Sequence, residues 1–174
     1  MSSAAGTLPR EEDLSAPAAL ANFSFGQGDL LATPLQIAAM VNAIADDGLY
    51  TEPSLVQGRY AGREEVVATA ASVSYRAMTS RSAELVRGYM EAAVEGGTAS
   101  AGKPEAGGAG AKTATAETGS QKDGEPVIQA WCAGFYPAGE PRYTIVVMAE
   151  NGKSGSGVCA PVFKEIADGL AALD

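Results

Sequence analysis

Apolar side chains recur at the spacing of an amphipathic helix in three separate stretches of the chain. The first stretch begins at Thr33, which can cap a helix; a proline follows at the first helical position, Gln36 completes a capping box, and Gly48 marks the end. The second covers residues 82–95, and the third begins at Pro161. The three stripes comprise Leu35, Ile37, Ala38, Met40, Val41 and Ile44, then Leu85, Val86, Tyr89, Met90, Ala93 and Val94, then Val162, Phe163, Ile166, Ala167, Leu170 and Leu173. The pattern predicts three helices.

Between the second and third helix the pattern becomes that of β-strands. Residues 111–117, 127–136 and 142–150 favour strands, and a turn rich in proline and glycine at 137–141 separates the last two. The stretch 143–148 is apolar on both faces, which predicts a central strand with a layer on each side. Helices followed by a hairpin sheet and one more helix indicate an α+β fold, with an antiparallel sheet of three strands packed against helices.

Three other segments show no clear period. Residues 1–22 are rich in Ala, Ser, Pro and acidic side chains, and we expect an extended lead-in. Residues 51–74 contain short β-favouring pieces at 54–56 and 66–67, which predict a small irregular β excursion. Residues 98–111 hold no apolar side chain larger than alanine, so they form either a mobile linker or a loop held by its neighbours.

Composition and charge remove several classes of function. Of the 174 residues 46% are hydrophobic, but 34 of them are alanines, so any core is thin. The absence of histidine excludes His-based triads, and a formal net charge of −9 without a basic run makes a nucleic-acid partner unfavourable. No stretch has the length of a membrane span, and the first 21 residues do not resemble a secretion signal.

The two cysteines, Cys132 and Cys159, lack the spacing of a metal site, and two thiols cannot complete a structural zinc site. Two buried free thiols and one disulfide both remain compatible with the sequence. We expect neither a metal nor another cofactor.

Residues 107–113 superficially resemble a phosphate-binding loop. Such a loop needs glycine directly before its lysine and again five residues earlier, and Ala111 and Ala106 occupy those positions here. Lys112 is better placed on a strand of small and hydroxyl-bearing residues, 112–117. That strand is either a platform on which an extended peptide pairs, with donors for a carboxylate, or an ordinary polar edge strand with a solvated lysine.

Several segments, in order, resemble one family: the transpeptidase domain of high-molecular-mass penicillin-binding proteins. They span nearly the whole chain and are specific as an ordered set. The segments are Ser24-Phe25-Gly26-Gln27-Gly28, Thr33-Pro34-Leu35-Gln36-Ile37-Ala38, Ala45-Asp46-Asp47-Gly48, Glu95-Gly96-Gly97-Thr98, Lys112-Thr113-Ala114-Thr115-Ala116-Glu117, Trp131-Cys132-Ala133-Gly134-Phe135-Tyr136-Pro137, Glu150-Asn151-Gly152 and Ala160-Pro161-Val162-Phe163.

The resemblance implies a serine D,D-transpeptidase that cross-links peptidoglycan. The family acylates a serine in an S-x-x-K motif and uses an S-x-N motif and a K-T-G strand. No Ser-x-Asn occurs here, and the only Ser-x-x-Lys begins at Ser100 in the Gly/Ala loop, where a buried nucleophile helix is not expected. We therefore expect residues 23–174 to be the C-terminal part of a transpeptidase domain, inactive alone, that needs a missing N-terminal half.

The same resemblance assigns roles along the strand. Lys112 would move protons during acylation and attract the terminal carboxylate of a D-alanyl-D-alanine stem peptide or of a β-lactam. Thr113 and Thr115 would donate hydroxyls to that carboxylate, and the backbone N–H of Thr115 would form half of the oxyanion hole. Ala114 replaces the family's glycine, which predicts a poorer substrate fit.

The resemblance also bears on location and partners. The parent protein would carry a membrane anchor outside this sequence and work on the extracytoplasmic face of the bacterial membrane. Without the missing strands, 142–150 would be an open edge, which predicts homo-oligomers or a strand swap. A non-catalytic peptide-binding or scaffold module derived from the same fold is the alternative, favoured by Ala114 and by the absent nucleophile.

Overall fold

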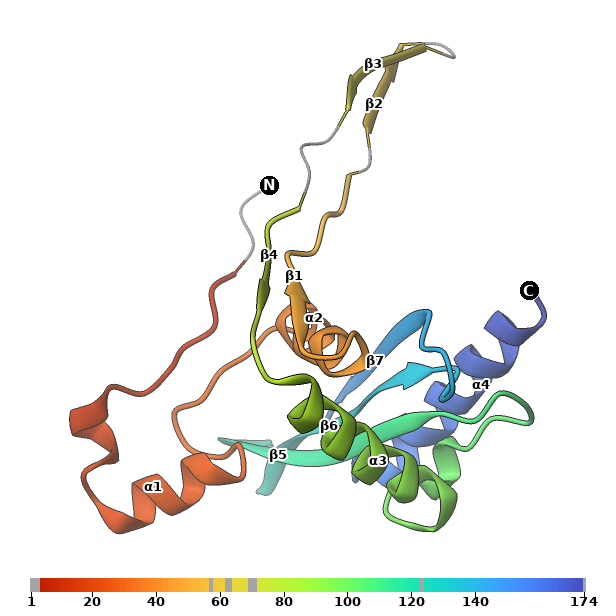
Figure 1. Cartoon of the computed structure of the whole chain (residues 1–174). Helices are drawn as coiled ribbons and strands as arrows, with labels where there is room; N and C mark the ends of the chain where they lie inside the picture. Colours follow the sequence, from red (N-terminus) through yellow and green to blue (C-terminus); the bar gives the residue numbers. More distant parts are fainter. Residues whose placement is uncertain (1–3, 57, 62–63, 69–71, 123, 174) are drawn as a thin grey trace.

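A three-stranded antiparallel sheet forms the centre of the computed structural model, which describes residues 4–56, 58–61, 64–68, 72–122 and 124–173. Its strands are β5 (Gly110–Lys122), β6 (Glu125–Tyr136) and β7 (Tyr143–Glu150), in the order β5-β6-β7 (Figure 1). The α+β class and the three strands predicted from the sequence are confirmed.

Helices cover both faces of this sheet. Alternate residues of β6 point to opposite sides, so Ala133 and Phe135 pack with α2 (Pro34–Ala45) and α3 (Ser80–Gly96), while Cys132 packs with α4 (Ala160–Ala171). The largest fully buried side chains are Phe135, Phe163, Val41, Val94, Cys132 and Cys159. The remaining core positions are mostly alanine, as the composition predicted.

The strand order corrects one prediction. The doubly apolar stretch was expected to be central, but β6 is the central strand and β7 lies at the edge of the three-stranded sheet. Most residues of β7 are half-buried, because α2 packs on one of its faces and α4 on the other. Its apolar character thus reflects covered faces, whereas its outer main-chain edge has no strand partner among the described residues.

The first helix begins as its capping signals predicted. The Thr33 hydroxyl accepts the backbone N–H of Gln36 at 3.2 Å, and the Gln36 side chain accepts the Thr33 N–H at 2.9 Å. In α3 the Thr79 hydroxyl accepts the N–H of Ser82, and the helix starts two residues earlier than its apolar stripe indicated.

The expected β excursion is a long two-part arm that projects away from the sheet (Figure 1). Strands β1 (Leu49–Thr51) and β4 (Ser74–Arg76) form its base, and β2 (Gly58–Ala61) and β3 (Glu64–Ala68) form its outer part. The rings of Tyr50 and Tyr75 pack 4.9 Å apart across the base. The 66–67 piece lies in β3 as predicted, whereas 54–56 is not a strand.

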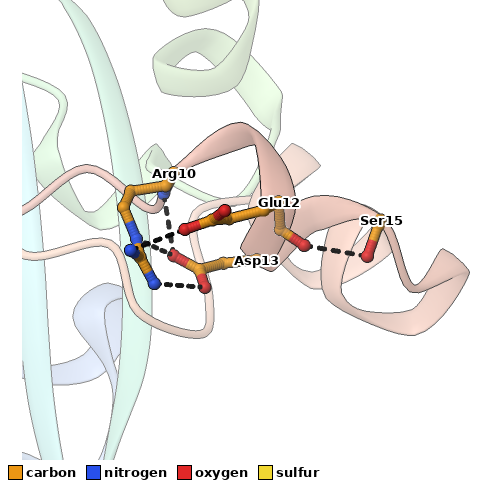
Figure 2. Close-up of polar contacts among 4 residues, drawn as sticks. All are labelled: Arg10, Glu12, Asp13 and Ser15. Atoms are coloured by element: carbon orange, nitrogen blue, oxygen red, sulfur yellow. Dashed lines mark hydrogen bonds and ion pairs between the residues drawn. The ribbon is translucent and has the colours of Figure 1, made fainter.

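The lead-in is not extended throughout, which corrects a second prediction. It contains a 3-10 turn, η1 (Glu11–Leu14), and a helix, α1 (Pro17–Ser24). Figure 2 shows how the turn is held: the Arg10 guanidinium contacts the carboxylates of Glu12 and Asp13, and the Arg10 N–H donates to Asp13. Local ion pairs stabilise this turn, so its sequence lacks the apolar periodicity that a buried helix would show.

The loop before β5 is held by its neighbours, the second of the two expected alternatives. It contains a short 3-10 turn, η2 (Ser100–Gly102), and Lys103 pairs with Glu95 of α3 at 2.7 Å. The Glu105 N–H donates to Asp168 of α4 at 2.8 Å, and Lys164 contacts both carboxylates. These contacts fix the entry of the chain into β5.

Candidate active site

A groove of about 780 Å³ lies between α2, α3 and the face of the sheet that β5 and β6 form. Its walls are largely apolar: Leu31, Ile37, Met40, Val41, Ile44, Val86, Tyr89 and Met90. Its floor includes Lys112, Ala114, Ala116, Trp131 and Ala133. Met40, Leu31 and Tyr89 are 49%, 63% and 71% exposed, so apolar side chains at the rim of the groove face solvent in the described part of the chain.

Strand β5 carries the predicted site residues, and its register decides where they point. Lys112 pairs with Ala133 and Ala114 with Trp131, so both side chains share the groove face of the sheet. Lys112 is exposed, and its Nζ donates to the Thr113 carbonyl oxygen. The structure therefore puts Lys112 and Ala114 together at the groove.

Thr113 and Thr115 lie on the other face of the strand, toward the start of α4. Thr113 is only 7% exposed, and its hydroxyl donates to the carbonyl oxygen of Thr98 at 3.4 Å. Thr115 is exposed at the strand edge, where its hydroxyl accepts the backbone N–H of Gly155 at 3.4 Å. The two threonines therefore differ, since only Thr115 keeps its hydroxyl proton at the surface.

The Thr115 carbonyl oxygen has a partner from a distant part of the sequence. The side-chain amide of Gln27 donates to it at 3.3 Å. Gln27 stands between Gly26 and Gly28, which both have φ of +82°, so the chain turns tightly around it. Sequence analysis missed this contact because the two residues are 88 positions apart and no local pattern links them.

Gly155 opens the short helical turn η3 (Gly155–Cys159), which precedes α4 and packs directly on the sheet. A Cβ at this position would lie 2.3 Å from the Trp131 carbonyl oxygen and 2.5 Å from that of Ala114. Only glycine allows this approach. Sequence analysis did not single out Gly155 either, although a glycine just before the last helix was visible.

Ser100, the first residue of the only Ser-x-x-Lys sequence, lies away from the groove. Ser100 begins the short 3-10 turn η2, and Lys103 pairs with Glu95 on the surface. Neither residue lines the groove. No group of three or more His, Cys, Asp or Glu side chains in the described part of the chain could hold a metal ion.

Both cysteines are buried and free. They lie in the same core cluster, Cys132 on β6 and Cys159 at the start of α4. Burial, together with the neighbouring Cys159, raises the pKa of the Cys132 thiol to about 12. Burial also raises the pKa of the Cys159 thiol, partly offset by a hydrogen bond to the Ala149 backbone. Neither thiol is suited to act as a nucleophile.

Comparison with known proteins gives one consistent result. A family model described as the penicillin binding protein transpeptidase domain matches residues 2–168. Peptidoglycan D,D-transpeptidase PbpA of Mycolicibacterium smegmatis is 30% identical over 150 residues, covering 83% of this chain and 30% of the relative. Penicillin-binding protein PbpB of the same organism is 30% identical over 181 residues, covering 95% of this chain and 28% of the relative.

Solved structures agree with these relatives. Penicillin binding protein 3 of Mycobacterium tuberculosis superimposes with a TM-score of 0.83 at 28% identity, covering 98% of this chain and 41% of that one. Penicillin-binding protein A of M. tuberculosis, solved as an imipenem acyl-enzyme complex, gives a TM-score of 0.76 at 29% identity, covering 92% and 35%. The chain thus spans about three tenths of the length of the curated relatives it matches.

Proposed function

Because the chain belongs to the penicillin-binding protein transpeptidase domain family, we propose that it supplies one wall of a serine D,D-transpeptidase active site. The observation that carries the proposal is strand β5, which presents Lys112 to the groove and the polar groups of Thr115 at an open edge. A strand edge of this kind pairs with extended peptides, and a nearby ammonium group favours a carboxylate.

The reaction proposed for the complete domain is acyl transfer. A serine hydroxyl attacks the penultimate D-alanyl carbonyl of a stem peptide, the terminal D-alanine leaves, and an amine of a second stem peptide takes the acyl group. Lys112 attracts the terminal carboxylate and assists proton transfer. The N–H of Thr115 stabilises the oxyanion, and its hydroxyl donates to the carboxylate.

Thr113 takes a smaller part in this proposal. Its hydroxyl is nearly buried and already donates to Thr98, so it reaches a ligand only if that hydrogen bond opens. Ala114 adds a methyl group to the groove side of the strand, at the position where the family has glycine. Both features favour Lys112 and Thr115 as the principal ligand contacts of this chain.

The nucleophile is proposed to come from an N-terminal half of the domain, outside these 174 residues. Two features of the structure support that partner. The groove leaves an apolar rim uncovered, which suits an apolar helix bearing an S-x-x-K motif. The outer edge of β7 has no strand partner among the described residues, which suits two further strands of the same sheet.

Location and inhibitors follow from the family in the same way. We infer that the complete protein acts on the extracytoplasmic face of a bacterial membrane, held by an anchor encoded outside this sequence. We also infer that β-lactams acylate it. A homologous structure is an imipenem acyl-enzyme complex. Within the described residues, no helix combines the length and apolar character that crossing a membrane requires.

Labelling with a fluorescent penicillin tests the proposal. The 174-residue chain alone should stay unlabelled, and the complete transpeptidase domain that contains it should form a covalent adduct on a serine outside the chain. Labelling of the chain alone would show that the nucleophile has been misplaced. A complete domain that is folded yet unlabelled would favour the non-catalytic scaffold alternative instead.

A further inference from the structure

The hydrogen-bond register of β5 determines which way the main chain of Thr115 faces. The Cβ position built on Gly155 lies within 3 Å of Ala114 N, Ala114 O and Trp131 O. One point can lie this close to all three atoms only if Ala114 and Trp131 form a hydrogen-bonded pair, in which the N–H of each residue donates to the carbonyl oxygen of the other. Because such pairs alternate, the N–H and C=O of Thr115 point away from β6, out of the sheet.

Both acceptor groups of this outward-facing residue are engaged by other parts of the chain. The hydroxyl oxygen accepts the N–H of Gly155, and the carbonyl oxygen accepts the amide of Gln27. No described residue accepts from the N–H or the hydroxyl proton of Thr115. Two donors therefore remain at this position.

We propose that Gln27 and Gly155 are positioning residues that make Thr115 a pure donor toward a bound anion. The inference rests on the proposed function and extends it to two residues that touch no reacting atom. The Gly155 N–H directs the hydroxyl proton away from η3. The Gln27 amide places its positive end on the carbonyl oxygen, which would otherwise present negative charge beside a bound carboxylate or oxyanion.

Glycine at 155 is essential to this arrangement. The missing side chain lets the backbone of Gly155 lie close to the sheet, where a Cβ would collide with the carbonyl oxygens of Trp131 and Ala114, and its N–H thereby reaches the Thr115 hydroxyl at 3.4 Å. Any side chain would push the turn off the sheet and lengthen this contact. Gly26 and Gly28 have a similar role, because their left-handed backbone conformation holds the side-chain amide of Gln27 against β5.

The contact to Gly155 can be measured on the 174-residue chain without any activity. Amide hydrogen exchange of Gly155, followed by NMR, should accelerate about fivefold in Thr115→Val, because the acceptor is lost. Thr115→Ser keeps the hydroxyl and should restore the wild-type rate. Thr118→Val, on the same strand, should leave Gly155 unchanged. An unchanged exchange rate in Thr115→Val overturns the proposed contact.

The functional consequence is measured in the complete transpeptidase domain with fluorescent penicillin. Gln27→Met keeps the shape of the side chain but removes the donor, and should slow acylation by roughly three- to tenfold at an unchanged Tm. Gln121→Met, at the far end of β5, is the control and should acylate at the wild-type rate. In a Thr115→Val background, Gly155→Ala should cause a smaller loss than it does with threonine at 115, because no hydroxyl remains to be oriented.

The outcomes separate this inference from the proposed function. If the unmodified complete domain is not acylated, both are wrong, whatever the exchange data show. If it is acylated but Gln27→Met reacts at the wild-type rate, the positioning role of Gln27 is overturned and the transpeptidase assignment stands. If Gly155→Ala costs as much with valine at 115 as with threonine, Gly155 acts through general packing alone.

Discussion

At the scale of single residues, Ala114 is the clearest departure from the family pattern. Its methyl group lies on the groove side of β5, between Lys112 and Ala116, where a ligand strand would approach. We expect Ala114→Gly to raise the rate of penicillin acylation several-fold in the complete domain, while lowering stability by about 0.5–1 kcal/mol through added backbone freedom. A slower or equal rate would mean that this methyl group does not obstruct the ligand.

The buried thiols give a second prediction for individual residues. Cys132 and Cys159 are fully buried, and a raised pKa leaves few thiolates at neutral pH. A thiol reagent such as 5,5′-dithiobis(2-nitrobenzoic acid) should react with neither cysteine in the native chain and with both after denaturation in guanidinium chloride. Rapid reaction of the native chain would contradict the packing of β6 against α4.

The sequence predicts the position of a single side chain correctly where that position depends only on neighbouring residues in the same strand. The position of Lys112 on β5 could be predicted from the alternation of its neighbours. The burial of Thr113 could not, because it depends on a loop that folds over the strand and offers the Thr98 carbonyl. Thr115 contacts Gly155 and Gln27, which lie 40 and 88 residues away in the sequence, so no local pattern could predict these contacts.

At the scale of elements, α4 and the loop before β5 are joined by a small ionic cluster. Asp168 accepts from Lys164 and from the Glu105 N–H, and these hydrogen bonds hold its pKa below the usual 3.8. A lowered carboxyl pKa stabilises the folded chain above the unfolded-state pKa, and that contribution is lost as pH falls through the folded-state pKa.

This cluster gives a prediction with a defined sign. Asp168→Asn should lower the Tm at pH 7, and the difference from the wild type should shrink as pH falls below 3.8 and vanish below the lowered folded-state pKa of Asp168. Glu165→Gln, exposed on the same helix, serves as the control and should leave the Tm unchanged at pH 7. A difference between Asp168→Asn and the wild type that does not shrink at all as the pH is lowered below 3.8 would place its origin outside the ionic cluster.

Elements with local start signals were predicted well, and those shaped by distant contacts were not. Helix α2 could be located from its cap and its proline alone. Helix α1 could not, because it buries no residue and shows no apolar stripe to detect. The edge position of β7 was also missed, because helices covering both faces give an edge strand the apolar pattern of a central one.

At the scale of the whole molecule, no other described part of the chain pairs with the outer edge of β7 or fills the apolar groove. An exposed apolar surface of this kind favours association. We expect the 174-residue chain to run on gel filtration as an oligomer, and addition of the N-terminal half of the domain to convert it to a one-to-one complex. A soluble monomer of 17.6 kDa would count against this expectation.

The central claim is that β5 forms the wall of a shared active site, and a crystal structure of the penicillin-acylated complete domain tests it most directly. The account predicts an acylated serine outside residues 1–174, with the penicillin carboxylate within hydrogen-bonding distance of the Thr115 hydroxyl and its acyl oxygen at the Thr115 N–H. Penicillin bonded to a residue of this chain, or bound away from β5, would contradict the account.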